Sequence, residues 1–205
     1  MAPGGVMMVD LWEIERTCFD RGLALVCGCD EAGAGPLAGA VYAAAVILPA
    51  GLVIDGLNDS KQVSPKKRDE LFPLIQAEAM AWAVASADEK EIDEINILNA
   101  RLLAMDRAIH MLSPVPGYAL IDGNRNRGIS IPNEVVIKGD SRSASIAAAS
   151  ILAKVSRDRY MEEMAALYPQ YEFDKHKGYP TKRHYELLRR YGPCPIHRRT
   201  FLKNL

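Results

Sequence analysis

The chain has 205 residues, of which 49% are hydrophobic and 25% are charged, and its formal net charge at pH 7 is −1. These values are typical of a soluble globular domain with a full core, and no stretch approaches the roughly 18 uninterrupted apolar residues of a membrane span. The acidic N-terminal region lacks the basic start and apolar core of a signal peptide, and the four cysteines lack zinc-type spacing, so we expect a cytoplasmic protein with reduced thiols.

The first half of the chain predicts three strands and two helical stretches. Residues 1–22 form an acidic, partly helical lead-in. Apolar runs predict strands over 24–30 and 40–48, joined as an antiparallel hairpin by a glycine-rich turn. Ser64 followed by Pro65 predicts the start of a helix that runs to about residue 79, and residues 82–86 predict a third strand. Helical spacing of apolar residues over 89–112 predicts a helix with a break near Asn96.

The second half predicts alternating strands and helices. Strands are expected over 118–122 and 134–138, a helix over 143–160, and one or two short helices after it. Three strands followed by alternating helix and strand indicate an α/β fold, a mixed sheet with helices on its faces.

Basic residues are concentrated at the C-terminal end. Residues 174–205 carry nine Lys or Arg and two acidic residues, a net charge of +7, which leaves −8 on residues 1–173. This asymmetry is typical of a polyanion-binding extension beside an acidic, metal-binding body, although a solvated basic helix is the alternative. We expect His197, Arg198 and Arg199 to lie in a basic tail that contacts the backbone of such a polyanion.

Four carboxylates follow the same pattern. Asp30, Asp122 and Asp140 each stand at or just past the C-terminal end of an apolar strand, and Glu31 follows Asp30. Ligands bind at that edge of α/β sheets. A single Asp in such a place is often a turn residue or a helix cap. A set of four would repel one another without a cation, and oxygen-only ligands favour Mg²⁺ or Mn²⁺ over zinc.

The sequence resembles a known family through six blocks in order, over roughly residues 24–201. The blocks are Asp30-Glu31-Ala32-Gly33, Asn58-Asp59-Ser60-Lys61, Leu120-Ile121-Asp122-Gly123-Asn124, Lys138-Gly139-Asp140, Ala147-Ala148-Ala149-Ser150-Ile151-Leu152-Ala153-Lys154 and His176-Lys177-Gly178-Tyr179. They look like the signature blocks of bacterial ribonuclease HII, a type 2 ribonuclease H.

The resemblance implies a ribonuclease H-like five-stranded mixed sheet with a C-terminal helical extension. It divides the chain into the lead-in 1–22 and a single domain over 23–205, whose catalytic core ends at about residue 165. The implied enzyme hydrolyses the RNA strand of RNA–DNA hybrids. It also nicks duplex DNA on the 5′ side of embedded ribonucleotides by two-metal-ion catalysis, in support of ribonucleotide removal and DNA repair. Asp30, Glu31, Asp122 and Asp140 match the metal-binding carboxylates. Nothing in this mechanism requires a partner chain, so a monomer is expected.

Substrate-binding residues are also implied, with one departure from the family. A Gly-Arg-Gly turn is the family's ribonucleotide sensor, and here the turn is Gly33-Ala34-Gly35, without the arginine. Tyr179 matches a tyrosine that stacks on the adjacent deoxyribose. Further expected contacts to the substrate are Ser60, Lys61, Asn124, Ser150 and Lys154.

Two rival functions remain open from the sequence. Ala34 is compatible with a substrate-binding but catalytically weakened variant. The glycines of residues 33–39 suggest a nucleotide-binding loop, but this loop lacks the Gly-Lys-Ser/Thr ending of a P-loop and leaves Asp122 and Asp140 unexplained.

Overall fold

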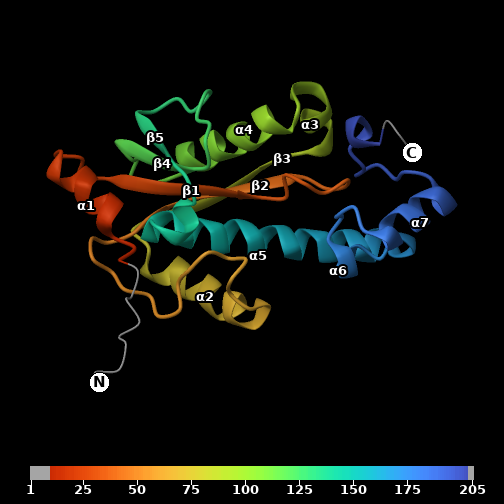
Figure 1. The fold of residues 1–205 in the computed structure, drawn as a ribbon, viewed down its shortest axis with the longest axis horizontal. Coiled ribbons are helices and arrows are strands. Elements are labelled where there is room, and N and C mark those ends of the chain that lie inside the picture. Colours follow the sequence, from red (N-terminus) through yellow and green to blue (C-terminus); the bar gives the residue numbers. More distant parts are fainter. Residues whose placement is uncertain (1–9, 203–205) are drawn as a thin grey trace, which may run out of the picture.

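A five-stranded mixed sheet lies between two layers of helices in the computed structural model, which describes residues 10–202 (Figure 1). The sheet order is β3-β2-β1-β4-β5, and the strands are β1 (Val26–Ala32), β2 (Val41–Ile47), β3 (Ala81–Ala87), β4 (Tyr118–Asp122) and β5 (Asn133–Val136). Strands β1, β2 and β3 pair antiparallel, whereas β4 pairs parallel with both β1 and β5. The predicted mixed sheet and its hairpin are confirmed.

Small residues bring the helices close to the sheet. Helix α4 (Ile97–His110) covers one face, and α5 (Ala144–Leu167) covers the other, with α2 (Pro65–Glu78) packed outside α5 (Figure 1). A Cβ at Gly28 of β1 would lie 2.2 Å from the Ile146 amide nitrogen, so only glycine fits where β1 meets α5. None of the helices formed by residues 10–202 has the length and apolarity to cross a lipid bilayer.

Local capping fixes the helix starts that the sequence predicts. Ser64 accepts a hydrogen bond from the Lys67 amide at the start of α2. Helices α3 (Glu89–Ile95) and α4 are separated at Asn96, whose φ is +65° and whose side chain caps α4. The predicted break at Asn96 is confirmed.

The N-terminal region contains helix α1 (Glu13–Asp20), which packs against the body of the protein. The buried carboxylate of Glu15 accepts hydrogen bonds from the Ser143 hydroxyl and from the Ser145 amide and hydroxyl. These bonds attach α1 to the start of α5. Residues 1–9 of the predicted lead-in lie outside the described residues.

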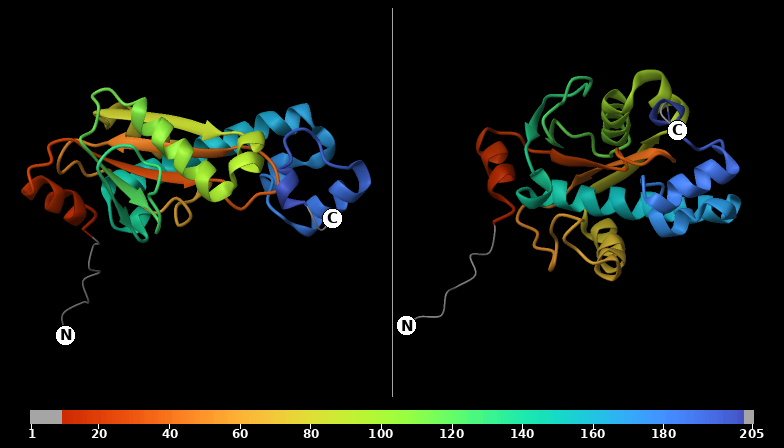
Figure 2. Two further views of the ribbon diagram at one scale, coloured as in Figure 1. Left: turned by 90° about the horizontal axis from the view of Figure 1, so that it is seen from above. Right: turned by 45° about the vertical axis from the view of Figure 1, so that its right-hand side comes forward.

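The C-terminal extension packs around the C-terminal half of α5 (Figure 2). It contains two 3-10 helices, Pro169–Tyr171 and Arg199–Phe201, and helices α6 (Phe173–His176) and α7 (Lys182–Tyr191). Tyr171 and Phe173 are the buried aromatic centre of this extension. The extension therefore shares an apolar cluster with the end of α5, in addition to carrying the basic residues that the sequence displays.

Three expectations from the sequence need correction. Strand β1 continues two residues past Asp30, because residues 30–32 still pair with β2, so Asp30 and Glu31 lie within the strand. Helix α5 extends to Leu167, seven residues beyond the predicted end. His197 and Arg198 are fully buried rather than part of an exposed basic tail, because their side chains bond to protein atoms, and only Arg199 is exposed.

Candidate active site

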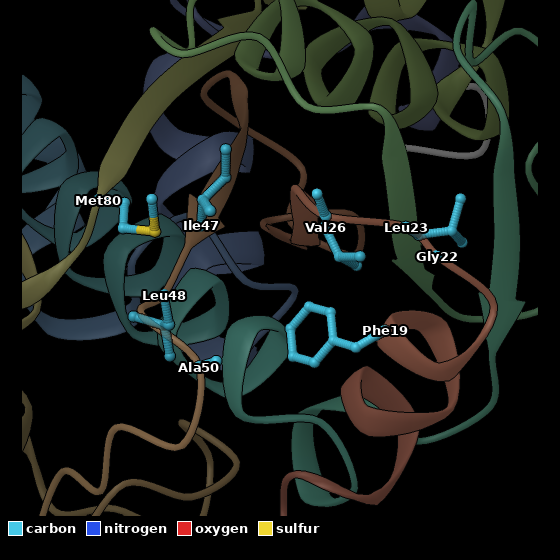
Figure 3. Close-up of a pocket in the computed structure, with 9 residues that line it drawn as sticks. Phe19, Gly22, Leu23, Val26, Ile47, Leu48, Ala50 and Met80 are labelled. Atoms are coloured by element: carbon cyan, nitrogen blue, oxygen red, sulfur yellow. The ribbon is translucent and has the colours of Figure 1, made fainter.

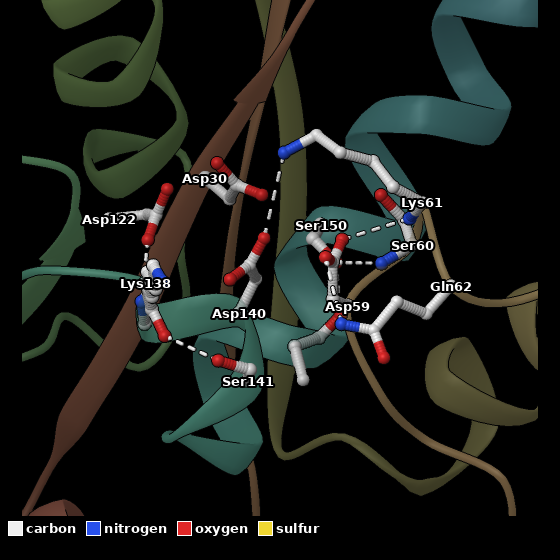
Figure 4. A network of polar contacts seen from close by, with 12 residues as sticks. Asp30, Asp59, Ser60, Lys61, Gln62, Asp122, Lys138, Asp140, Ser141 and Ser150 are labelled. Atoms are coloured by element: carbon white, nitrogen blue, oxygen red, sulfur yellow. Dashed lines mark hydrogen bonds and ion pairs between the residues drawn. The ribbon is translucent and has the colours of Figure 1, made fainter.

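Three aspartates from distant parts of the chain meet at one edge of the sheet (Figure 4). Asp30 lies in β1, Asp122 ends the neighbouring parallel strand β4, and Asp140 lies in the 3-10 turn that follows β5. One oxygen from each carboxylate lies within 4.8 Å of the others. The strand order explains the convergence, because β1, β4 and β5 are adjacent and parallel.

Burial and mutual repulsion make this cluster electrostatically unfavourable by itself. Burial and the nearby Glu31, Asp122 and Asp140 raise the pKa of Asp30 well above its usual value. The pKa of Asp140 is also raised, first by burial and then by Asp122. A hard divalent cation relieves this repulsion, and an all-carboxylate donor set is the kind that Mg²⁺ and Mn²⁺ prefer. The residues present therefore fit such an ion.

Glu31 differs from the three aspartates. Its Oε1 accepts a hydrogen bond of 3.1 Å from Nη1 of Arg101 on α4, and its buried Oε2 has no hydrogen-bond partner among the described residues. Burial raises the pKa of Glu31, although Arg101 opposes the shift. Glu31 is thus held beside the cluster by a cation, with one carboxylate oxygen left for a further ligand.

The loop before α2 lies over the cluster and adds positive charge. The Lys61 ammonium lies 3.7 Å from Oδ2 of Asp140 (Figure 4). Burial lowers the pKa of Lys61, but the surrounding Asp30, Asp59 and Asp140 outweigh this effect and raise it. The buried hydroxyl of Ser150 on α5 accepts a hydrogen bond from the Ser60 amide, so Ser150 holds this loop rather than facing solvent.

The turn of residues 33–35 and Tyr179 line a cavity of about 240 Å³ next to Asp30. Lys61 and Lys154 line the same cavity, and Lys154 also forms an ion pair with Asp158. Tyr179 is 42% exposed, so its ring is available to a ligand. Two cationic side chains and an exposed aromatic ring beside the acidic cluster suit an anionic ligand that carries planar or sugar rings.

Two other hollows contribute less to the site. Asn124 is exposed and lines a separate surface hollow with Arg125 and Arg127, so the structure does not place it in the cavity with Tyr179. A larger hollow of about 500 Å³ lies between α1 and the sheet, where Phe19, Val26 and Leu48 line it (Figure 3). None of its lining residues is titratable, so it offers no groups for catalysis.

The fold and the acidic edge define a nuclease of the ribonuclease H class. Residues 27–204 match the family model described as Ribonuclease HII. A ribonuclease HII of Caldicellulosiruptor saccharolyticus is 52% identical over 194 residues, which cover 95% of each chain. The chain therefore belongs to the ribonuclease HII family, and it is a metal-dependent hydrolase that cleaves the RNA strand of RNA–DNA hybrids.

Solved structures agree with this assignment of the fold. The ribonuclease H2 of Pyrococcus horikoshii OT3 superposes with a TM-score of 0.70 at 28% identity, covering 86% of this chain and 93% of that one. A Bst-RNase HIII structure in complex with Mn²⁺ has a TM-score of 0.62 at 20% identity and covers 82% of this chain and 63% of that one.

Three arginines have roles at the site that the sequence did not indicate. Arg101 pairs with Glu31, whereas Arg157 and Arg198 are buried beneath the turn of residues 33–35. Arg101 interrupts an apolar stretch of a predicted helix, which is a weak signal, whereas Arg157 stands in a polar and charged part of its helix, between Ser156 and Asp158. Arg198 lies within a basic segment whose charges look alike in the sequence, so no local signal distinguishes it.

Proposed function

We propose that this enzyme nicks duplex DNA on the 5′ side of an embedded ribonucleotide, in addition to cleaving RNA–DNA hybrids. The convergence of Asp30, Asp122 and Asp140 within 4.8 Å is the observation that carries the proposal. The cavity next to Asp30 supports it, because a nucleic-acid strand with one scissile phosphate at the aspartates also reaches the turn of residues 33–35 and Tyr179.

Asp30, Asp122 and Asp140, with Glu31 beside them, would hold two Mg²⁺ or Mn²⁺ ions. When bound, such ions supply an activated water and stabilise the leaving 3′ oxygen. Mn²⁺ is present in the related ribonuclease HIII structure. The Asp122 carboxylate is oriented by the Gly139 amide, which donates a 2.7 Å hydrogen bond to its Oδ1, so this ligand is fixed before any ion binds.

The surrounding side chains bind and orient the substrate. The backbone of Gly33, Ala34 and Gly35 meets the 2′-hydroxyl, the one group that separates RNA from DNA at a given position. Tyr179 stacks on the next deoxyribose, and Lys61, Lys154 and Ser60 contact phosphates near the cleavage site. Asn124 contacts a phosphate further along the strand, and Ser150 fixes the Ser60 loop.

The basic extension holds the duplex, and the protein acts as a cytoplasmic monomer in ribonucleotide removal and DNA repair. Helix α7 presents Lys182, Arg183, Arg189 and Arg190 as exposed cations. Counterion release at such residues favours binding to a phosphate backbone. Because Ala34 stands where the family has arginine, the alternative function is a protein that binds the substrate but cleaves it weakly.

A nicking assay tests the proposal. The substrate is duplex DNA with one ribonucleotide, incubated with Mg²⁺, with Mn²⁺ and with chelator. We expect one nick 5′ of the ribonucleotide, with 3′-hydroxyl and 5′-phosphate ends. We also expect Asp122→Asn to lower the rate by several orders of magnitude, because it removes a charged ligand from the cluster.

Asp20→Asn is the matched control, since Asp20 is an exposed residue at the end of α1 and this variant should cleave like the wild type. Failure of the wild type to nick with either ion would contradict the proposed activity. Normal binding without nicking would instead support the weakened variant.

A further inference from the structure

The guanidinium of Arg198 is bonded to the backbone of the turn that contains Ala34. Its Nη2 donates to the Gly33 carbonyl at 2.6 Å, its Nη1 to the Ala34 carbonyl at 3.1 Å, and its Nε to the Gly39 carbonyl at 2.9 Å. Arg198 is 0% exposed, and no carboxylate of the described residues forms an ion pair with it. A buried charge satisfied by three carbonyls fixes the orientation of those carbonyls.

This arrangement determines where two amides of the turn point. A peptide unit is planar and trans, so the C=O of one residue and the N–H of the next point in opposite directions. Because the carbonyls of Gly33 and Ala34 face Arg198 inside the protein, the amides of Ala34 and Gly35 face outward. Within residues 10–202, neither amide has a hydrogen-bond acceptor. Arg198 therefore presents two unpaired donors on the outer side of the turn.

Arg157 supports the same segment from α5. Its Nη2 donates to the carbonyls of Ala38 and Lys177, and its Nε donates to the Ala40 carbonyl. Its guanidinium carbon lies 5.9 Å from the centre of the Tyr179 ring. The turn and Tyr179 are thus held in one relative position by a second buried cation, and Arg198 brings the end of the C-terminal extension to the same place.

We propose that Arg198 is a positioning residue that makes the enzyme specific for ribonucleotides by aiming the Ala34 and Gly35 amides at the 2′-hydroxyl. The inference rests on the proposed function. It also explains how the turn keeps its shape with alanine at position 34, because its backbone is oriented from beneath and not by the side chain at its tip.

Arg198→Lys tests the proposal, with Arg199→Lys as the matched control. Lysine keeps the positive charge but carries all its donors on one nitrogen, so it cannot reproduce the three bonds that Nε, Nη1 and Nη2 of Arg198 make from separate positions of a planar group. The readout is the ratio of two dissociation constants, for plain duplex DNA and for the same duplex with one ribonucleotide, measured with Ca²⁺ as the divalent ion. We expect Arg198→Lys to reduce this ratio about tenfold, which corresponds to roughly 1.4 kcal/mol. Arg199→Lys should leave this ratio unchanged, because the exposed Arg199 side chain bonds to no carbonyl of the turn and any phosphate contact it makes is common to both duplexes.

A second measurement on the wild type needs no variant and is unaffected by a folding defect. Hydrogen exchange at the Ala34 and Gly35 amides should be fast in the free protein and slowed by the ribonucleotide-containing duplex, but not by plain DNA. Equal protection by both duplexes, or an unchanged ratio in a folded Arg198→Lys, would overturn the inference. A wild type that nicks the ribonucleotide-containing duplex but binds both duplexes equally would also overturn the inference. A wild type that does not nick this duplex with Mg²⁺ or Mn²⁺ would instead refute the proposed function itself, and so the two failures are distinguishable.

Discussion

Gly33→Ala should strongly destabilise the turn next to the active site. Gly33 has φ of +96°, and a Cβ placed there would lie 2.0 Å from Nε of the buried Arg157. The methyl group therefore meets two obstacles at once. It imposes a backbone conformation that L-residues rarely adopt, and it occupies the volume that the Arg157 side chain needs.

The expected cost follows from these two effects. A non-glycine residue in an unfavourable backbone region costs about 1–3 kcal/mol. Displacing Arg157 breaks at least one charge-assisted hydrogen bond, which contributes roughly 1.5–3 kcal/mol. We therefore expect Gly33→Ala to lower the free energy of unfolding by about 3 kcal/mol or more, a fall in Tm of roughly 6–12 °C for a domain of this size.

Gly35→Ala, two residues away, is the matched control for urea and thermal unfolding. Gly35 does not have a positive φ, and its Cβ would only reach ordinary contact, 3.7 Å from the Tyr179 ring. Its effect on stability should stay within about 1 kcal/mol. The two positions differ in backbone conformation, and only the methyl group at position 33 meets Arg157. Equal losses of stability in the two variants would therefore refute the reasoning.

Two further predictions concern substrate affinity and pH. Ala34→Arg should lower KM about fivefold, the effect of roughly 1 kcal/mol from one exposed ion pair, because it adds a cation at a phosphate. Ala34→Gln should not, and equal KM values for Ala34→Arg and the wild type would contradict this expectation. Burial is the main cause that lowers the pKa of His184 and of His197 to about 4, and the neighbouring His176 adds to the shift of His184 as His184 adds to that of His197. The unfolded chain therefore binds these protons at higher pH than the folded one. The contribution of neutral His184 and His197 to the free energy of unfolding is complete above about pH 6.5. It is lost as the pH falls towards 4, by up to about 3 kcal/mol for each histidine. Urea unfolding of the wild type and of His184→Gln at pH 7 and pH 5 gives the difference between their free energies of unfolding at each pH. The titration of the acidic cluster is common to both proteins, so it cancels in this difference. A difference that does not change with pH would exclude this role for the histidines.

Much of the fold follows from local patterns in the sequence. Ser64 and Pro65 mark the start of α2, Asn96 marks the break between α3 and α4, and the apolar runs mark all five strands. These features depend on residues close together in the chain, such as a cap and the amide that it satisfies. The extent of β1 past Asp30 was missed because it depends on pairing with β2, which no local pattern reveals.

The acidic cluster was predictable in outline but not in detail. The position of Asp30, Asp122 and Asp140 at related strand ends indicated that they converge, and the structure brings them together. It also separates Glu31 from them through the ion pair with Arg101. That pair joins β1 to α4 across seventy positions of sequence, so its partner could not be read from residues near Glu31.

The sequence by itself determined the order of the elements, the family and the acidic residues, because each is encoded by residue types at characteristic spacings. Only the tertiary structure decided what the basic residues do. Arg198 and Arg199 are neighbours of identical charge, yet Arg198 is buried against three carbonyls and Arg199 is exposed. The physical reason is that the role of a charge depends on which distant backbone groups surround it, and folding alone brings those groups together.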